Sequence, residues 1–455
     1  MAGQGRRLCH PGRGGGLRAL DQRLLHQRGR PAGDRDAGAA GRAGDGPAAR
    51  RRANPVPAVR GRLAVTGGRA LIDGWPGETR AAVLTPADDG GEALNELLIQ
   101  RADRPSLTGN LYLGRVVARD RGLNAAFVDL GLARPGLLPL KAAPDRLQEG
   151  AGVPVRIVRE PSPGKGPKLA PAADAPETHA QPPALLAQAT PLIDLLRRAE
   201  PDAILVEGAG RLRALADAAP DLAGRLRGHT GAQPLFEAAG LNAAIDRLLD
   251  AEVPLPGGGQ LLIEPVRTLT AIDVDAGQAD ARGGRARQAL AVNLRAAAEI
   301  ARQARLRALS GLIVVDFLDL ETKSDRQQVA RALEAGFAGD PVETSVSPMR
   351  ASGLVEIARQ RIRPPLHELL SLPAGRAGRV ADTATLAYDL LRRAWAEALA
   401  NPGRQPVLVA HPDVLAELDG RLEDAHAALA RALGAAPGRR GDPTRPRTAF
   451  DILLA

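Results

Sequence analysis

Two apolar runs that each end on aspartate, with an amphipathic segment between them, constrain the fold more than any other feature. Residues 269–275 read Leu-Thr-Ala-Ile-Asp-Val-Asp, and residues 311–316 read Gly-Leu-Ile-Val-Val-Asp. In an extended strand, Asp273 and Asp275 point to the same face, about 7 Å apart along the chain. The second run is apolar enough to predict a buried strand, and it ends on Asp316.

Apolar residues recur every three or four positions between these runs, which predicts a helix with one apolar stripe. The stripe consists of Leu290, Leu294, Ala297, Ala301, Ala304 and Ala308. Because a strand–helix–strand unit brings neighbouring strand ends together, we expect Asp273 and Asp316 to converge on one hard cation. Carboxylates together with substrate phosphate are the ligands that Mg²⁺ prefers. An aspartate after a buried strand is also a common helix cap, so these residues alone leave both interpretations open.

Composition narrows the class of protein. A chain of 455 residues predicts several domains, and only 2% of the residues are aromatic, so the cores must be built from aliphatic side chains. The single cysteine, Cys9, excludes an internal disulfide and a cysteine-ligated zinc within one chain. No run is long enough to span a membrane, and no signal peptide opens the sequence. We therefore expect a soluble, cytoplasmic protein without a membrane partner.

The net charge of +9 is concentrated at the N-terminus. Residues 1–62 contain 14 arginines, no lysine and four aspartates, whereas the remainder has 47 basic and 48 acidic residues. This Arg/Gly-rich segment has no helical or strand periodicity, and we predict that it is disordered. Two interpretations stay open: a basic tail that tethers RNA, and sequence upstream of the true translation start.

Four blocks of sequence, in order over about ninety residues, resemble the catalytic core of the bacterial ribonuclease E/G family. They are residues 269–277, 292–307, 311–317 and 353–361. The resemblance implies that Asp273 and Asp316 hold the Mg²⁺ used to hydrolyse single-stranded RNA. It also implies that Asp275 supports the metal, although the family has Asn at that position. Arg359 and Arg361 are candidates for contacts with backbone phosphates, the alternative being plain surface charge.

A second set of motifs lies at residues 105–170, where short alternating strands are separated by turn residues and predict a small closed barrel of the OB-fold type. This segment resembles the RNA-binding OB-fold near the start of the same family. The resemblance makes Phe127 a base-stacking residue, and the alternative is a core position. The family's second aromatic falls on Leu137, which predicts a weaker grip on the base. Lys165 matches a basic loop beside the active site and is a candidate phosphate contact.

The fold class implied is α+β and multidomain. Residues 69–104 and 191–250 would form a ribonuclease-H-like scaffold, interrupted by the OB-fold at 105–170. Residues 171–190 are a linker in place of the family's 5′-sensor domain. A catalytic α/β domain of the deoxyribonuclease-I-like type would occupy 251–370, and a small α/β domain would occupy 376–455, with a helix over 382–399 and another over 412–433. The paired cysteines of the family's zinc link are absent.

These features predict a Mg²⁺-dependent endoribonuclease that acts on single-stranded RNA in RNA processing or decay. The alternative is a non-catalytic RNA-binding protein that retains the fold. A homodimer is compatible with the sequence, but an assembly joined by zinc is not. The sequence does not specify which RNA is cut.

Overall fold

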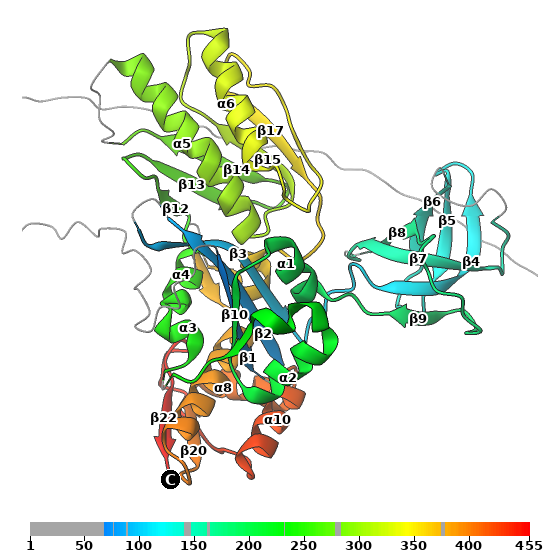
Figure 1. Ribbon diagram of the computed structural model, residues 1–455, viewed down its shortest axis with the longest axis vertical. Helices are drawn as coiled ribbons and strands as arrows, with labels where there is room; N and C mark the ends of the chain where they lie inside the picture. The colour runs from blue at the N-terminus through cyan, green and yellow to red at the C-terminus, as the bar shows by residue number, and fades with distance from the viewer. Residues whose placement is uncertain are drawn as a thin grey trace, which may run out of the picture. The chain divides into compact units, whose positions relative to one another are not determined.

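The computed structural model describes residues 68–75, 77–87, 90–140, 147–161, 164–231, 233–277, 284–374 and 378–455 (Figure 1). The basic segment at residues 1–62, for which disorder was predicted, lies outside these described residues. Helices and strands are both abundant, as the mixed α+β class requires.

The first sheet joins two parts of the sequence that are far apart. Its strand order is β11-β10-β1-β2-β3, in which β1 to β3 are antiparallel and β10 and β11 run parallel to β1. The strands are β1 (Arg69–Trp75), β2 (Glu78–Pro86), β3 (Glu92–Arg101), β10 (Ala203–Val206) and β11 (Leu226–Gly228). Strands from both parts of the predicted scaffold therefore share one sheet.

Helices cover both faces of this sheet, because successive residues of a strand point to opposite sides. Ala70 and Ile72 pack with α1 (Pro191–Ala199), α2 (Ala209–Ala218) and the 3₁₀-helix Pro220–Arg225. Leu71 packs on the other face with α3 (Leu235–Ala238), α4 (Leu241–Arg247) and α7 (Leu366–Leu370).

A closed five-stranded barrel follows β3, as the alternating motifs predict. Its strands pair in the order β4-β5-β6-β8-β7, and β7 returns to β4. They are β4 (Leu111–Asp120), β5 (Ala125–Asp129), β6 (Gly136–Pro139), β7 (Gly152–Arg159) and β8 (Lys168–Pro171). A further strand, β9 (Ala184–Ala187), pairs with β4, so part of the segment expected to be a linker is a strand.

The third sheet carries the two acidic strand ends. Its order is β12-β13-β14-β15-β17-β16, and β14 and β15 are parallel neighbours. The strands are β12 (Glu252–Pro254), β13 (Gln260–Pro265), β14 (Thr270–Asp275), β15 (Gly311–Asp316), β16 (Thr344–Val346) and β17 (Leu354–Arg359). Two helices, α5 (Arg285–Leu306) and α6 (Lys323–Gly336), lie on one face of the sheet (Figure 1).

The helix expected between the two acidic runs is present, with a displaced apolar stripe. Ala297, Ala301 and Ala304 are fully buried, but Leu290 and Leu294 are only partly buried. Residues on the adjacent positions, Val292, Ala296 and Ile300, complete the buried face. Ala308 was expected in the stripe but lies beyond the end of α5, with a φ of +51°. The wide buried face reflects the contact of α5 with both the sheet and α6.

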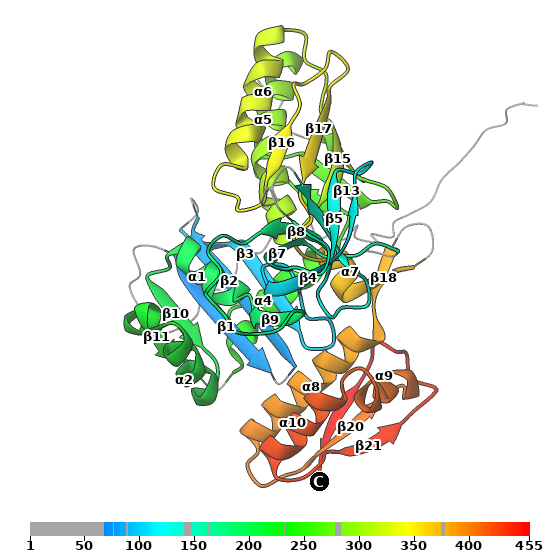
Figure 2. The ribbon, with the colours of Figure 1, turned by 90° about the vertical axis from the view of Figure 1, so that its right-hand side faces the viewer.

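The C-terminal residues form a hairpin and a small α/β unit. The hairpin is β18 (Ser371–Ala374) with β19 (Gly378–Ala381). The strand order of the following sheet is β21-β20-β22. Its elements are α8 (Thr383–Ala400), β20 (Pro406–Ala410), α9 (Pro412–Ala416), the 3₁₀-helix Glu417–Asp419, α10 (Glu423–Leu433), β21 (Gly438–Gly441) and β22 (Asp451–Leu454). Figure 2 shows α8 and α10 side by side.

Two sequence expectations for this unit differ in outcome. Asp382 caps α8 by accepting a hydrogen bond of 2.7 Å from the Thr385 N–H, so the predicted helix begins where expected. The single helix expected over 412–433 was wrong. The chain there forms two helices separated by a 3₁₀ turn and Gly420, whose backbone is non-helical. Among the described residues, no helix has the length and apolar character needed to cross a membrane.

Candidate active site

Asp273 and Asp316 are direct neighbours in the sheet. The parallel pairing of β14 with β15 places Ile272 opposite Val315 and Asp273 opposite Asp316. Residues paired in this way lie on strands about 4.8 Å apart, and their side chains point to the same face. Both aspartates are exposed to solvent. The structure therefore brings together the two carboxylates that were expected to converge.

The face that carries these aspartates is opposite the helices. Ile272, Val274, Ile313 and Val315 are buried against α5 and α6. Because side chains alternate along a strand, the acidic residues between them point away from this core. This arrangement leaves the carboxylates accessible to a large substrate while the backbone beneath them is held by a packed layer.

The donor set fits Mg²⁺ better than a metal held by protein ligands alone. Within the described ranges, neither the carboxylate of Asp273 nor that of Asp316 has a hydrogen bond or ion pair to another residue. The described residues also contain no group of three or more His, Cys, Asp or Glu side chains placed to hold a metal ion. Mg²⁺ is commonly bound by one or two carboxylates and completes its octahedron with water and phosphate oxygens. A structural zinc site, by contrast, needs four protein ligands.

Asp275 lies on the same face, but its carboxylate is already engaged. Oδ1 accepts a hydrogen bond of 2.9 Å from the Gly277 N–H, and Oδ2 accepts one of 3.3 Å from Gln260 Nε2. These contacts close the turn that follows β14. The structure thus brings two of the three predicted aspartates together and places the third further along the strand.

Two residues that were not singled out from the sequence hold the backbone next to Asp316. The fully buried Asn293 of α5 donates from Nδ2 to the Leu318 carbonyl oxygen (2.8 Å) and accepts from the Leu318 N–H (3.1 Å). Gly353 has a φ of +79°, and a Cβ there would lie 2.5 Å from the Phe317 carbonyl oxygen. The sequence signal for Asn293 was a polar residue within the apolar face of an otherwise amphipathic helix.

Phe127 lies on the outer side of the barrel. Its neighbours Ala126 and Val128 are fully buried in the barrel core, whereas Phe127 is partly exposed and is not part of that core. Strand pairing sets it directly opposite Leu137, which is also partly exposed. Of the two interpretations of Phe127, the geometry matches an outward-facing ring with an aliphatic neighbour.

The basic residues predicted to contact phosphate differ in exposure and in whether they already form an ion pair. Lys165 is exposed. Arg361 is also at the surface, but its guanidinium forms a two-point ion pair with Glu368 at 2.6 and 3.0 Å. Such surface pairs are weak, and a phosphate can compete for them.

Arg359 does not fit the phosphate contact expected of it. It is 6% exposed and donates to both carboxylate oxygens of Asp340, at 3.0 and 3.1 Å, and to the Leu309 carbonyl at 2.7 Å. Burial lowers the pKa of Arg359, and the nearby Asp340 opposes this shift. The geometry corrects the expectation, because Arg359 belongs to the fold's internal ion pairs and not to the solvent-facing surface.

The part of the chain that carries the acidic strand pair matches a known protein family. Residues 174–362 match the model of the Ribonuclease E/G family. This range includes β14, α5, β15 and β17, the elements that form the candidate site. Residues 174–362 belong to that family, and the resemblance recognised from the four motifs is confirmed.

The individual relatives are named as ribonucleases of the E and G types. The chain is 25% identical to ribonuclease G of Escherichia coli (strain K12), over 84% of this chain and 99% of the relative. It is 36% identical to ribonuclease E of the same organism, over 40% of this chain and 17% of that relative. It is 38% identical to the chloroplastic ribonuclease E/G-like protein of Arabidopsis thaliana, over 35% of this chain and 16% of the relative.

Proposed function

We propose that this chain is an endoribonuclease that hydrolyses single-stranded RNA with a Mg²⁺ ion held by Asp273 and Asp316, in RNA processing or decay. One observation carries the proposal: two unpartnered carboxylates are paired in register on the open face of a sheet. The names of the relatives, ribonuclease G and ribonuclease E, support the reaction class.

When bound, Mg²⁺ would supply Lewis-acid polarisation of the scissile phosphate and lower the pKa of a coordinated water. The protein's own contribution is to hold two negative charges at fixed positions beside the substrate. Asn293 fixes the backbone that follows Asp316 through its two hydrogen bonds to Leu318. Asp275 adds negative charge nearby while it closes the turn after β14. By analogy with the family, the products carry a 5′-phosphate and a 3′-hydroxyl.

Substrate binding is assigned to the barrel and its basic loop. The partly exposed ring of Phe127 is available for stacking on a base, a contact worth about 1–3 kcal/mol. Its neighbour Leu137 has no aromatic face, so a base can stack on Phe127 but not on residue 137. Lys165 is exposed and supplies a mobile positive charge for the backbone.

The proposal also includes a division of labour along the chain. Residues 69–104 and 191–250 serve as a ribonuclease-H-like scaffold, 105–170 as an OB-fold RNA-binding module, and 251–370 as a deoxyribonuclease-I-like catalytic unit. The strand order β11-β10-β1-β2-β3 and the closed barrel support the first two assignments. The partner is single-stranded RNA, and the compartment is the cytoplasm.

A cleavage assay tests the proposal. An internally labelled single-stranded RNA is incubated with purified protein in Mg²⁺, with and without EDTA. Asp273→Asn and Asp316→Asn each remove one metal ligand, and Asp319→Asn is the matched control because it removes an exposed carboxylate from the loop just after β15. We expect internal cleavage by wild type and Asp319→Asn only, and none with EDTA.

Other results would contradict the proposal. RNA binding without cleavage by wild type would support the non-catalytic alternative. Equal cleavage by wild type and by Asp273→Asn or Asp316→Asn would show that the metal site is not at the ends of β14 and β15.

A further inference from the structure

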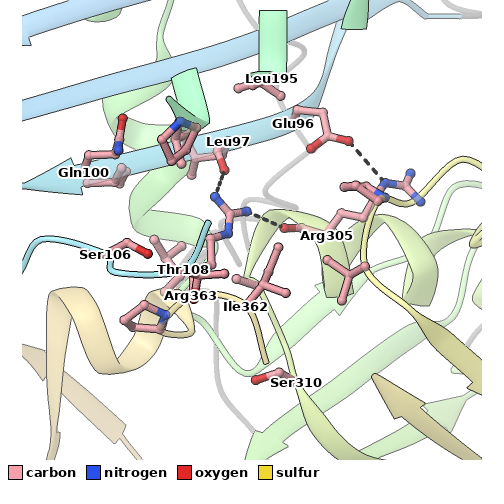
Figure 3. Close-up of a pocket in the computed structure, with 18 of the residues that line it drawn as sticks. Glu96, Leu97, Gln100, Ser106, Thr108, Leu195, Arg305, Ser310, Ile362 and Arg363 are labelled. Atoms are coloured by element: carbon pink, nitrogen blue, oxygen red, sulfur yellow. Dashed lines mark hydrogen bonds and ion pairs between the residues drawn. The ribbon is translucent and has the colours of Figure 1, made fainter. Parts of the chain in front are cut away.

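A cavity of about 260 Å³ lies at the far end of strand β15 from Asp316. Ser310, just before β15, and Arg359, at the end of β17, both line it. Its other walls come from β3, α1, the end of α5 and residues 360–366 (Figure 3). The proposed RNA-cleaving site uses none of these residues.

The cavity has more positive charge than its own carboxylates neutralise. Arg198 and Arg305 share one partner, Glu96, at distances of 3.5 and 3.8 Å. Arg363 has no carboxylate within ion-pair distance among the described residues. These three guanidinium groups therefore have one ion-pair carboxylate, Glu96, among the described residues; of the other lining carboxylates, Asp340 is paired with Arg359, and Asp194 is exposed. An anion in the cavity would restore the balance.

Arg363 holds its position without neutralising its charge. It donates to the carbonyl oxygens of Leu97 (2.9 Å) and Arg305 (3.2 Å), which are the contacts drawn in Figure 3. A guanidinium group has five N–H donors, so these two bonds leave donors for a ligand. The pKa of Arg363 is lowered to about 10, mainly by burial and also by the neighbouring Arg359 and Arg198, while Glu96 and Asp340 oppose the shift.

Neutral polar groups and apolar walls complete the lining. Gln100 and Ser310 are partly buried, and within the described chain neither side chain has a hydrogen-bond partner. Leu97, Ile99 and Leu195 supply aliphatic surface beside them. A site of this kind suits a ligand with one anionic group and one flat or apolar body.

We propose that this cavity binds a phosphate monoester of about the size of one nucleoside monophosphate. A guanidinium group matches a phosphate through paired, charge-assisted hydrogen bonds. The volume lies just below the range typical of ligand pockets, about 300–1,000 Å³, so the occupant is at most one nucleotide unit and not an oligomer. Free AMP and the phosphorylated first nucleotide of an RNA share this chemistry.

Calorimetric titration of the full chain with AMP, adenosine and inorganic phosphate tests the proposal. We expect saturable one-to-one binding of AMP, at least tenfold tighter than binding of either fragment. Gln100→Glu introduces a carboxylate of the same size into the lining, and Ser310→Asp does so from a second wall. Each should weaken AMP binding at least tenfold. Gln148→Glu, an exposed position on the barrel, makes the same charge change and should have no effect.

The result divides the alternatives. Equal binding of AMP by wild type, Gln100→Glu and Ser310→Asp, with all three folded by circular dichroism, would overturn the assignment. Phosphate binding as tight as AMP would leave an anion site and overturn the nucleotide. A 5′-phosphorylated trinucleotide separates the two sources, since tighter binding than AMP identifies an RNA end and weaker binding identifies a free nucleotide. None of these measurements requires RNA cleavage, so the inference stands or falls independently of the proposed function.

Discussion

Replacing Asn293 with alanine should damage catalysis more than its distance from the substrate suggests. Asn293 is fully buried in α5 and is bonded to both backbone groups of Leu318, two residues after Asp316. Its side chain therefore joins the helix layer to the segment that follows the proposed metal ligand Asp316. The expected effect has two parts, one on stability and one on rate.

The stability loss follows from the two hydrogen bonds. Each is worth about 0.5–1.5 kcal/mol net, and a buried group left unpaired costs about 1–3 kcal/mol. Leu318 is only partly buried, so water can reach its backbone and the cost stays at the lower end. The free energy of unfolding of Asn293→Ala should fall by about 2–4 kcal/mol, measured by denaturant titration.

The loss of cleavage rate follows because the backbone after Asp316 is no longer held by the Asn293 side chain. Once Leu318 is released, Asp316 samples more than one position, and the metal site is less often in its competent form. We expect cleavage to slow by about tenfold to a hundredfold, or about 1.4–2.8 kcal/mol in the activation barrier. The Mg²⁺ concentration at half-maximal rate should rise, because the ion must then organise the site.

A variant with matched instability separates positioning from folding. Leu429→Ala truncates a fully buried side chain in the C-terminal helix α10 and should cost about 2–5 kcal/mol. Assayed well below both melting temperatures, Leu429→Ala should cleave RNA with a wild-type Mg²⁺ dependence. A wild-type rate and Mg²⁺ midpoint for Asn293→Ala under the same conditions would refute the positioning role.

Three further outcomes are expected. Phe127→Ala should weaken RNA binding by about 1–3 kcal/mol with little change in melting temperature, because the ring lies outside the barrel core. The control Leu138→Ala truncates a core residue and should lower the melting temperature. A lower melting temperature with unchanged RNA binding in Phe127→Ala would make Phe127 structural. Arg359→Ala should destabilise the fold by about 3–5 kcal/mol by leaving the 1%-exposed Asp340 side chain unpaired, and Arg361→Ala by about 1 kcal/mol or less, as read by urea unfolding. Initial rates on one oligonucleotide with 5′-phosphate or 5′-hydroxyl ends should differ by less than tenfold, since residues 171–190 are predicted to be a linker in place of the family's sensor domain. A larger preference would reveal a 5′-end sensor elsewhere.

The sequence predicted the acidic strand pair well because local pattern and topology point to the same result. Strand alternation set the face of Asp273, and the amphipathic segment at 285–306 required a crossover that makes β14 and β15 parallel. The barrel was predictable for a similar reason, since turn residues separate its short strands. In both cases the arrangement is decided by backbone pairing between regular elements that the sequence pattern marks.

Features that depend on one particular side-chain contact or on pairing at a strand edge were not predictable. Arg359 looked like surface charge because nothing local shows that Asp340, across the sheet edge, neutralises it. Residues 184–187 read Ala-Leu-Leu-Ala, a short apolar run without the alternation or the β-branched side chains typical of a strand, and they form a strand by pairing with β4. Predicting the contact of Asn293 with Leu318 requires knowledge of where Leu318 lies, which the helix pattern does not contain.

Binding of Mn²⁺, a paramagnetic substitute for Mg²⁺, tests the central claim most directly. Electron paramagnetic resonance measures free Mn²⁺ in the presence of the protein without RNA, so it reports on the site independently of turnover. Asp273 and Asp316 as paired ligands predict a Mn²⁺ affinity in wild type and Asp319→Asn that falls at least tenfold in Asp273→Asn and in Asp316→Asn. Unchanged Mn²⁺ affinity in either ligand variant would contradict the metal site at the ends of β14 and β15.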